Sequence, residues 1–238
     1  MKKMVKALLG ILFISQGALA AVSLDHSRVI FTQGDKSQSV SAYNTANKKY
    51  LLQSLVFSDL SNENEPSHNF TVIPPIVTLK ENSSNALKIL PKGLNELPND
   101  RESLFYLMVN FIPETKKNNN DESSQINTKF NLSTKIVIKM FYRPNGINGN
   151  VKDYINELTA KQSGDRIIIN NPSPYYYTFV NIKMDKQPYI SDRAPMVAPF
   201  STFEIPTTKK VSKLEWDIIN DYGGETKLKS VTLNGTHK

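Results

Sequence analysis

The sequence of 238 residues contains no cysteine, only three histidines and a single tryptophan. Without cysteine there are no disulfides, no thiol catalysis and no thiolate metal sites, so a buried core has to hold the fold together. The three histidines, His26, His68 and His237, lack the spacing of metal ligands, so we predict no metal site. There is also no glycine-rich phosphate loop, and we expect no nucleotide or other cofactor.

Long apolar runs are equally scarce. The one at residues 7–14 is too short to span a bilayer. Three lysines precede it and an Ala-Leu-Ala pattern at 18–20 follows it, which is typical of a cleavable signal peptide over residues 1–20. We therefore expect an exported chain that begins at Ala21 and is not embedded in the membrane. Loss of three lysines lowers the formal charge from +7 to +4 (26 basic minus 22 acidic residues), which is too weak for a nucleic-acid binder.

Most of the remaining sequence consists of short strand-like segments. Apolar residues alternate with polar ones or form short runs rich in Val, Ile, Phe and Tyr, and turn signals recur about every 8–12 residues. We predict strands over 22–32, 38–43, 50–57, 69–73, 86–90, 104–111, 126–142, 166–169, 175–183, 200–205, 213–220 and 227–233. Only 151–160 reads as a short helix. This pattern predicts an all-β protein built from sandwiches.

The chain is long enough for two such domains of about 100 residues each. Proline and glycine in the run Arg143-Pro144-Asn145-Gly146 end a strand and bend the chain. We therefore predict one domain over residues 21–143 and a second over 144–238. Residues 114–127, rich in Lys, Asn, Asp and Ser, cannot bury apolar surface and are predicted to form a mobile loop.

The long strand after this loop has apolar residues or threonine at every even position, namely Ile126, Thr128, Phe130, Leu132, Thr134, Ile136 and Ile138. It is much longer than the usual strand of about five or six residues. Two interpretations follow. The apolar face packs into the domain's own core, or its first half is an exposed apolar edge that pairs with another chain.

Several motifs, taken together in chain order, resemble one protein family. They are AVSLDHSR at 21–28, QS at 53–54, PP at 74–75, LPNDRES at 97–103, IKMFYRP at 138–144, NPSPYY at 171–176 and INDYGG at 219–224. Over nearly all of the mature chain the sequence is similar to the PapD-like periplasmic chaperones of pilus assembly. The resemblance implies two immunoglobulin-like β-sandwich domains arranged as a boomerang with an interdomain cleft.

The resemblance also implies a function. It is that of a non-enzymatic periplasmic chaperone that binds, folds and caps pilus or fimbrial subunits by donor-strand complementation and delivers them to an outer-membrane usher. Arg28 and Lys139 match the residues that bind a subunit's terminal carboxylate. The donor strand is matched by Ile126, Thr128, Phe130, Leu132 and Thr134. Thr134 replaces a residue that is usually large and apolar, and the cysteine pair of the long-loop subfamily is absent, so the subfamily stays open.

Glu102, Arg143 and Asp221 match an internal charge cluster that joins the two domains in this family. A partly buried arginine between two carboxylates can fix the angle between domains, because loss of one member leaves the others unpaired.

These residues allow other interpretations. Glu102 and Asp221 could serve a hydrolase as acid and base, but Arg143 would keep both ionised and the sequence has no serine or histidine nucleophile motif. Arg28 and Lys139 could be ordinary surface charges. A pilin-like or adhesin-like subunit of a surface fibre is a further alternative, although pilins are generally single incomplete sandwiches. An exposed apolar edge would also favour an apo self-dimer. The sequence does not identify the pilus or the subunit.

Overall fold

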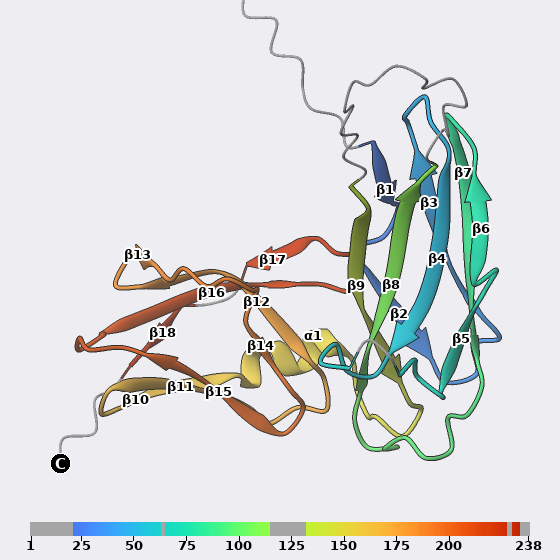
Figure 1. Cartoon of the computed structure of the whole chain (residues 1–238). Coiled ribbons are helices and arrows are strands. Elements are labelled where there is room, and N and C mark those ends of the chain that lie inside the picture. The colour runs from blue at the N-terminus through green and yellow to red at the C-terminus, as the bar shows by residue number, and fades with distance from the viewer. Residues whose placement is uncertain (1–20, 63–64, 115–131, 228–229, 234–238) are drawn as a thin grey trace, which may run out of the picture.

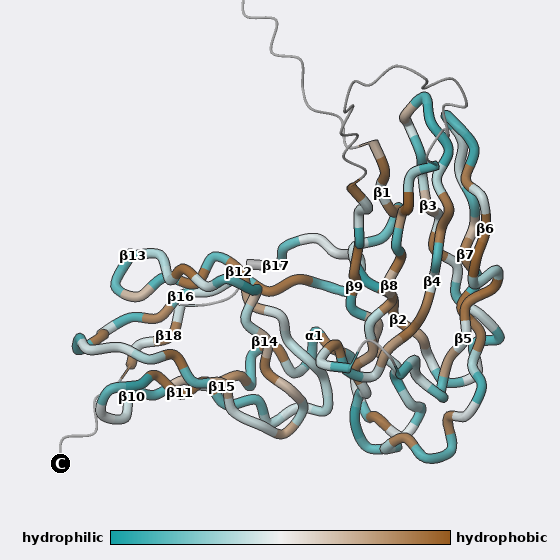
Figure 2. Tube along the Cα trace, in the orientation of Figure 1, coloured by the Kyte–Doolittle hydropathy of each residue, from teal (hydrophilic) through white to brown (hydrophobic). Residues whose placement is uncertain are grey.

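The structure, a computed structural model, describes residues 21–62, 65–114, 132–227 and 230–233. Two β-sandwiches meet at an elbow, with β1–β9 in the first and β10–β18 in the second (Figure 1). Apolar residues gather on the strands and hydrophilic residues on the connecting loops (Figure 2). The all-β fold with two domains that the sequence predicts is therefore confirmed. The domain boundary at Arg143 stays a prediction, and the expected signal peptide lies outside the described residues.

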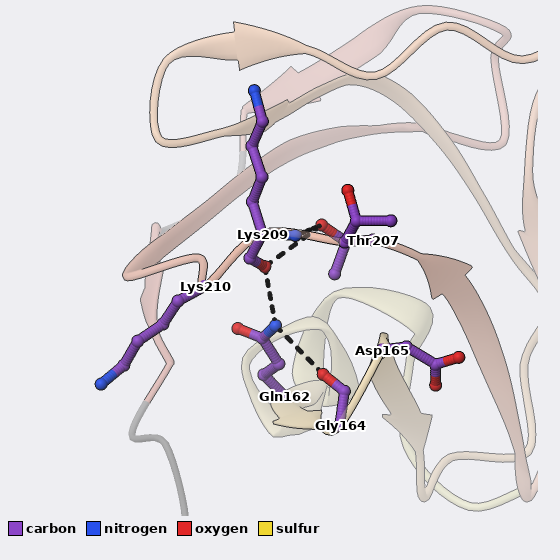
Figure 3. A pocket seen from close by; sticks show the side chains of 7 residues that line it. Gln162, Gly164, Asp165, Thr207, Lys209 and Lys210 are labelled. Atoms are coloured by element: carbon purple, nitrogen blue, oxygen red, sulfur yellow. Dashed lines mark hydrogen bonds between the residues drawn. The ribbon is translucent and has the colours of Figure 1, made fainter.

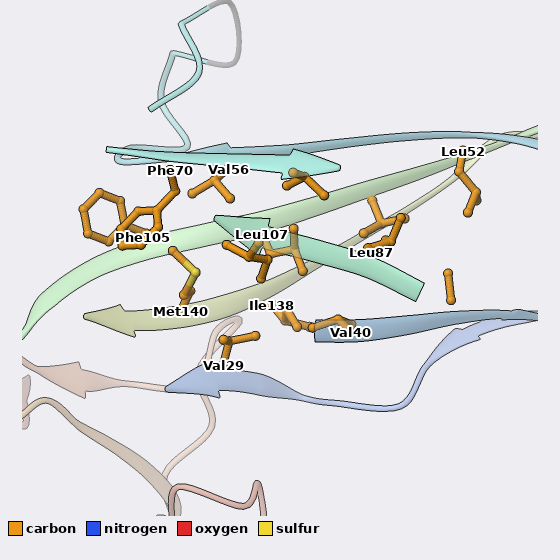
Figure 4. Close-up of a cluster of buried hydrophobic side chains, with 14 of the residues drawn as sticks. Val29, Val40, Leu52, Val56, Phe70, Leu87, Phe105, Leu107, Ile138 and Met140 are labelled. Carbon is orange, nitrogen blue, oxygen red and sulfur yellow. The ribbon is translucent and has the colours of Figure 1, made fainter. Parts of the chain in front are cut away.

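Two sheets face each other in the first sandwich. One has the order β1 (Val22–Leu24), β3 (Gln38–Asn44), β7 (Ser83–Pro91) and β5 (Phe70–Ile73). The other has the order β2 (Arg28–Thr32), β9 (Thr134–Arg143), β8 (Ser103–Pro113), β4 (Tyr50–Phe57) and β6 (Ile76–Leu79). Alternate side chains point between the sheets and form the core (Figure 4). Each large apolar side chain buried there stabilises the fold by roughly 1.5–3 kcal/mol.

The single strand predicted over 22–32 is wrong. The chain leaves one sheet after β1 and enters the opposite sheet at β2. Asp25 fixes this crossing, because its backbone N–H donates to the Ser41 carbonyl (3.1 Å) and its carboxylate accepts from the Ser41 N–H (2.8 Å). As a result β2 pairs with β9, in parallel, and Arg28 is its first residue.

The second sandwich has one sheet with the order β10 (Thr159–Ser163), β11 (Arg166–Asn171) and β15 (Ser201–Pro206). The facing sheet has the order β13 (Gln187–Pro188), β12 (Tyr177–Met184), β16 (Lys213–Ile219) and β17 (Glu225–Lys227), with β14 (Met196–Val197) beside β12 and β18 (Val231–Thr232) beside β16. The helix predicted over 151–160 is only α1 (Val151–Tyr154) and the 3-10 turn η1 (Ile155–Glu157). No helix in the described part of the chain is long and apolar enough to cross a membrane.

A surface hollow of about 420 Å³ lies at the turn between β10 and β11 (Figure 3), at the end of the second sandwich away from the first (Figure 1). In its lining, the Gln162 amide donates to the carbonyls of Gly164 (3.4 Å) and Lys209 (2.9 Å). Because these polar groups bind one another and lie far from the charged motifs of the sequence, we assign this hollow no function.

Candidate functional site

The parallel pairing of β2 with β9 places Arg28 directly opposite Lys139. Residues that are register partners in a sheet project their side chains to the same side. The Arg28 residue is only 8% exposed, and Lys139 is partly buried. Two cations far apart in the sequence are thus neighbours, and we call them the anchor pair.

The anchor pair also contacts the second sandwich. The Arg28 guanidinium donates from Nη1 to the Ile219 carbonyl (3.0 Å), at the end of β16. The Lys139 ammonium donates to the Thr178 hydroxyl (3.2 Å), in β12. The Arg28 Cζ atom lies 5.6 Å from the centre of the Phe141 ring. The anchor pair therefore lies at the junction of the two sandwiches.

Burial and mutual repulsion make the anchor pair costly. Burial, together with the charge of Arg28, lowers the pKa of Lys139 to about 8. Burial also lowers the pKa of Arg28, against the attraction of Asp221 and Glu102. Among the described residues neither cation forms an ion pair with a carboxylate, and the Arg28 Nε atom is buried without a hydrogen-bond partner. An anion bound here would offset both the burial and the repulsion.

An open sheet edge begins next to the anchor pair. β9 spans Thr134–Arg143, but β2 covers only its last residues, from Lys139 to Arg143. Ahead of Lys139, β9 pairs with β8 on one side alone within the part of the chain that the structure describes. Such an edge presents backbone N–H and C=O groups to another strand. Along this edge of β9, Ile138 faces the core and Val137 is 37% exposed.

Glu102, Arg143 and Asp221 lie together where the sandwiches meet, and we call them the hinge cluster. Arg143 donates from Nε (2.9 Å) and Nη2 (2.7 Å) to one Glu102 oxygen and from Nη1 to Asp221 (2.9 Å). The Glu102 side chain is 2% exposed and that of Asp221 is 35% exposed. Arg143 ends β9, Glu102 precedes β8 and Asp221 follows β16, so three segments of the chain are tied by one guanidinium.

Comparison with known proteins identifies the family. A family model of the PapD N-terminal domain, described as a pili and flagellar-assembly chaperone, matches residues 21–148. A second model, the C-terminal domain of the pili assembly chaperone PapD, matches residues 153–230. The chain belongs to the PapD-like pilus-assembly chaperones. This confirms the resemblance seen in the sequence, and it sets aside both the hydrolase and the pilin-like subunit.

Individual PapD-like chaperones are similar over most of their length. The probable fimbrial chaperone ElfD of Escherichia coli is 30% identical over 208 residues, which cover 86% of this chain and 84% of ElfD. The chaperone PmfD of Proteus mirabilis is 33% identical over 222 residues, covering 89% of this chain and 84% of PmfD. A chain in the structure of the Salmonella enterica SafA pilin in complex with the SafB chaperone has a TM-score of 0.78 and 26% identity, and the match covers 90% of this chain and 97% of that one.

The residues matched to the donor strand of PapD-like chaperones are only partly described. Ile126, Thr128 and Phe130 lie outside the described residues. Leu132 is 80% exposed and precedes β9. Thr134, the first residue of β9, is exposed as well. At Leu132 the side chain is therefore not part of the domain's own core, and pairing of this segment with another chain stays a prediction.

The sequence motifs did not reveal that the second sandwich forms hydrogen bonds with Glu102. In this PapD-like chain the Glu102 N–H donates to the Pro174 carbonyl (2.9 Å), and its second carboxylate oxygen accepts from the Tyr176 N–H (2.8 Å). Burial raises the pKa of Glu102 against the attraction of Arg143, while hydrogen bonds and the charges of Asp221 and Glu102 overcome burial and raise the pKa of Arg143. The NPSPYY motif at 171–176 contains both Pro174 and Tyr176, but the motif alone did not indicate their contact with Glu102.

A hollow of about 1010 Å³ lies beside the segment 144–156, near the junction of the two sandwiches. Residues of both sandwiches line it, including Thr32, Arg143, Tyr175 and Asp221. Neither member of the anchor pair lines this hollow. The described residues contain no group of three or more His, Cys, Asp or Glu side chains that could hold a metal ion.

Proposed function

We propose that this PapD-like chaperone captures a pilus subunit in two ways, by clamping the subunit's terminal carboxylate between Arg28 and Lys139 and by adding β9 to the subunit's fold. The observation that carries the proposal is the anchor pair, in which the buried Arg28 neighbours the partly buried Lys139 and no carboxylate is bonded to either in the described structure. The SafA–SafB structure is of a pilin in complex with a chaperone, and a chain in it has the same fold as this one.

The chemistry of the anchor pair fits a carboxylate. A carboxylate accepts hydrogen bonds from both cations, and each charge-assisted bond contributes roughly 1.5–3 kcal/mol. The contacts that Arg28 makes with Ile219 and that Lys139 makes with Thr178 restrict both side chains before a ligand arrives. Less side-chain entropy is then lost on binding.

The open edge of β9 fixes the direction in which the subunit would lie. If the last residue of the subunit lies at Lys139, the subunit residues before it would extend beside β9 from Ile138 back to Thr134. The subunit strand would therefore run in the same direction as β9, giving a parallel pair. The anchored carboxylate would also set the register, since a slip of one residue turns every side chain to the opposite face.

We assign further roles by the same reasoning. Leu132 and Thr134, with Ile126, Thr128 and Phe130 before them, would fill a groove in the subunit, and the hinge cluster would hold the angle between the sandwiches. Export to the periplasm through the signal peptide at 1–20, delivery of the subunit to an outer-membrane usher, and self-pairing of the free chaperone through its open edge belong to the same proposal. The division into domains at 21–143 and 144–238 accompanies it.

Capture of subunits from the periplasm tests the anchor pair. The tagged chaperone is co-expressed with candidate secreted subunits, and co-purified proteins are identified by mass spectrometry. We expect Arg28→Ala and Lys139→Ala to fold normally but to lose at least about tenfold in recovered subunit, the equivalent of one charge-assisted hydrogen bond.

Arg166→Ala and Lys209→Ala are the matched controls, because both remove a positive charge from the second sandwich, away from the anchor pair. Both controls should recover as much subunit as the unaltered chain. Recovery by the two anchor variants at the level of these controls would contradict the proposal.

A further inference from the structure

The turn between β16 and β17 reaches from the second sandwich toward the side of the first where β9 runs (Figure 1). Its residues 219–224 include Asp221 of the hinge cluster and the Ile219 carbonyl that accepts from Arg28. The remaining residues of the turn are Asn220 and 222–224. Gly223 faces Ser27 of the first sandwich with little space between them.

Gly223 packs against Ser27, the residue directly before Arg28. A Cβ atom added at Gly223 would lie 2.1 Å from the Ser27 Oγ atom and 3.4 Å from its Cβ atom. The backbone of Gly223 has φ +83°, a conformation that glycine adopts readily and other residues do not. The dihedral angle favours glycine, and an alanine methyl group would occupy the space that the Ser27 hydroxyl fills.

Hydrogen bonds within the turn hold its residues together, so a displacement at Gly223 would move the turn as a unit. The Asn220 N–H donates to the Gly224 carbonyl (2.8 Å) and the Gly223 N–H to the Asn220 carbonyl (3.0 Å). The Asn220 side-chain oxygen accepts from the N–H groups of Tyr222 (3.0 Å) and Gly224 (3.1 Å). Ile219 stands at the base of this closed turn.

Ser27, by contrast, is fixed on both sides. Asp25 is bonded twice to Ser41 of β3, and Arg28 begins the pairing of β2 with β9. The Ser27 backbone is therefore held in place, so a methyl group at Gly223 displaces either the exposed Ser27 hydroxyl or the turn that carries the Ile219 carbonyl. That carbonyl accepts the one hydrogen bond that the Arg28 side chain donates within the described part of the chain.

We propose that Gly223 is a positioning residue, which seats the turn 219–224 on Ser27 so that the Ile219 carbonyl orients the Arg28 guanidinium toward an incoming carboxylate. The inference rests on the function proposed above and deepens it. It assigns the second sandwich a part in carboxylate recognition that goes beyond joining the domains. Preorganised donors bind better because no ordering is needed when the ligand arrives.

Gly223→Ala tests this positioning role by two nuclear magnetic resonance measurements on the full mature chain. The first is the rate of rotation of the Arg28 guanidinium about its Nε–Cζ bond, which needs no ligand. The second is the shift of the Arg28 Nε–H signal during titration with sodium acetate at constant ionic strength. We expect faster rotation and an acetate affinity about fivefold weaker, because the Ile219 hydrogen bond is lost.

Rescue separates positioning from general damage. Ser27→Ala removes the Oγ atom that the new methyl group would meet, so the double variant Ser27→Ala, Gly223→Ala should return to within about twofold of the unaltered affinity. Gly164→Ala and Gly34→Ala are the strain controls, because both glycines have positive φ (+59° and +100°) and nothing within 4 Å of an added Cβ atom. Neither control should change the Arg28 signal.

Unchanged rotation and affinity in Gly223→Ala would overturn the inference, as would a defect that the Ser27→Ala change does not reduce. If acetate shifts neither Arg28 nor Lys139 in the unaltered chain, the anchor function itself fails. The rotation rates of the variants still decide the role of Gly223 in that case, so the two failures are distinguishable.

Discussion

Arg28 and Lys139 are cations that the fold brings together without neutralising them. Arg28 is 8% exposed, lies beside Lys139 across two parallel strands and leaves its Nε atom without a partner. An arrangement of this kind destabilises the free protein and is relieved by an anion. At the residue scale, the unpaired charge is therefore the strongest mark of a binding function.

Lys139 makes carboxylate binding depend on pH. Its pKa is lowered to about 8 by burial and by Arg28, while the neighbouring Tyr106 has its pKa raised by burial. A bound carboxylate favours the charged ammonium, so binding above pH 8 takes up a proton. We expect the affinity to be highest near pH 7 and to fall above pH 8 by at most about tenfold per pH unit.

Lys139→Arg is the control for this dependence, because a guanidinium stays charged throughout that range. Titration of the subunit, or of acetate, between pH 7 and 10 measures the effect. An unaltered chain with the same flat profile as Lys139→Arg would contradict the assignment. The stability of the free chaperone should change with pH in the opposite direction. Below pH 8 the charged Lys139 destabilises the fold, because its pKa is lower in the folded than in the unfolded chain, and this penalty is lost as the pH rises toward 10.5.

At the scale of elements, the sequence predicted strands well where apolar and polar residues alternate. The strand at 50–57 coincides with β4, and those at 38–43 and 213–220 differ from β3 and β16 by one residue. Alternation reflects one buried and one exposed face, which is a local property. Such strands can be predicted without knowing which strands lie beside them.

The strands that were missed or misjudged depend on tertiary contacts. β6 follows a proline pair and is an edge strand with one buried residue, and β10 (TAKQS) has a single apolar residue. β10 has no alternating pattern of its own, and β6 (IVTL) has only four residues, so the neighbouring strands that supply their hydrogen bonds decide both. The break between β1 and β2 likewise depends on the hydrogen bonds between Asp25 and Ser41. Periodicity alone could not place it.

The open edge of β9 gives a prediction at this scale. Leu132 is 80% exposed just ahead of the strand, so Leu132→Asp should leave the unfolding free energy within about 0.5 kcal/mol of its original value. Subunit recovery should nevertheless fall, because a charge replaces an apolar side chain at the interface.

Ile190→Asp is the matched control, since Ile190 is 87% exposed and lies in the second sandwich, between β13 and β14. Unfolding in denaturant and subunit recovery are measured for both variants. Equal recovery by the two variants would place the subunit contact elsewhere on the chaperone.

For the whole molecule, the hinge cluster is the main polar connection between the sandwiches. Arg143 bonds to Glu102 and to Asp221 with all three guanidinium nitrogens. The identities of these residues came from the motifs, but their meeting depends on how the sandwiches pack. Sequence patterns within one domain contain no information about that packing, so the cluster was predictable by resemblance and its geometry was not.

Arg143→Ala should loosen the connection. It leaves the Glu102 carboxylate buried and unpaired, so we expect a loss of about 3 kcal/mol in unfolding free energy, the lower end for buried ion pairs because Asp221 is partly exposed. Small-angle X-ray scattering should show a broader distribution of angles between the sandwiches. Arg166→Ala, which breaks an exposed pair with Glu204, should change neither quantity. A wild-type scattering profile and stability for Arg143→Ala would leave the cluster without a structural role.

The structure of the chaperone in complex with the subunit that it captures is the most direct test of the account. We predict that the subunit's terminal carboxylate lies about 2.7–2.9 Å from nitrogen atoms of both Arg28 and Lys139, with the preceding residues running parallel to β9 along its open edge. A subunit bound to another face of the chaperone, with its carboxylate in solvent, would contradict the central claim.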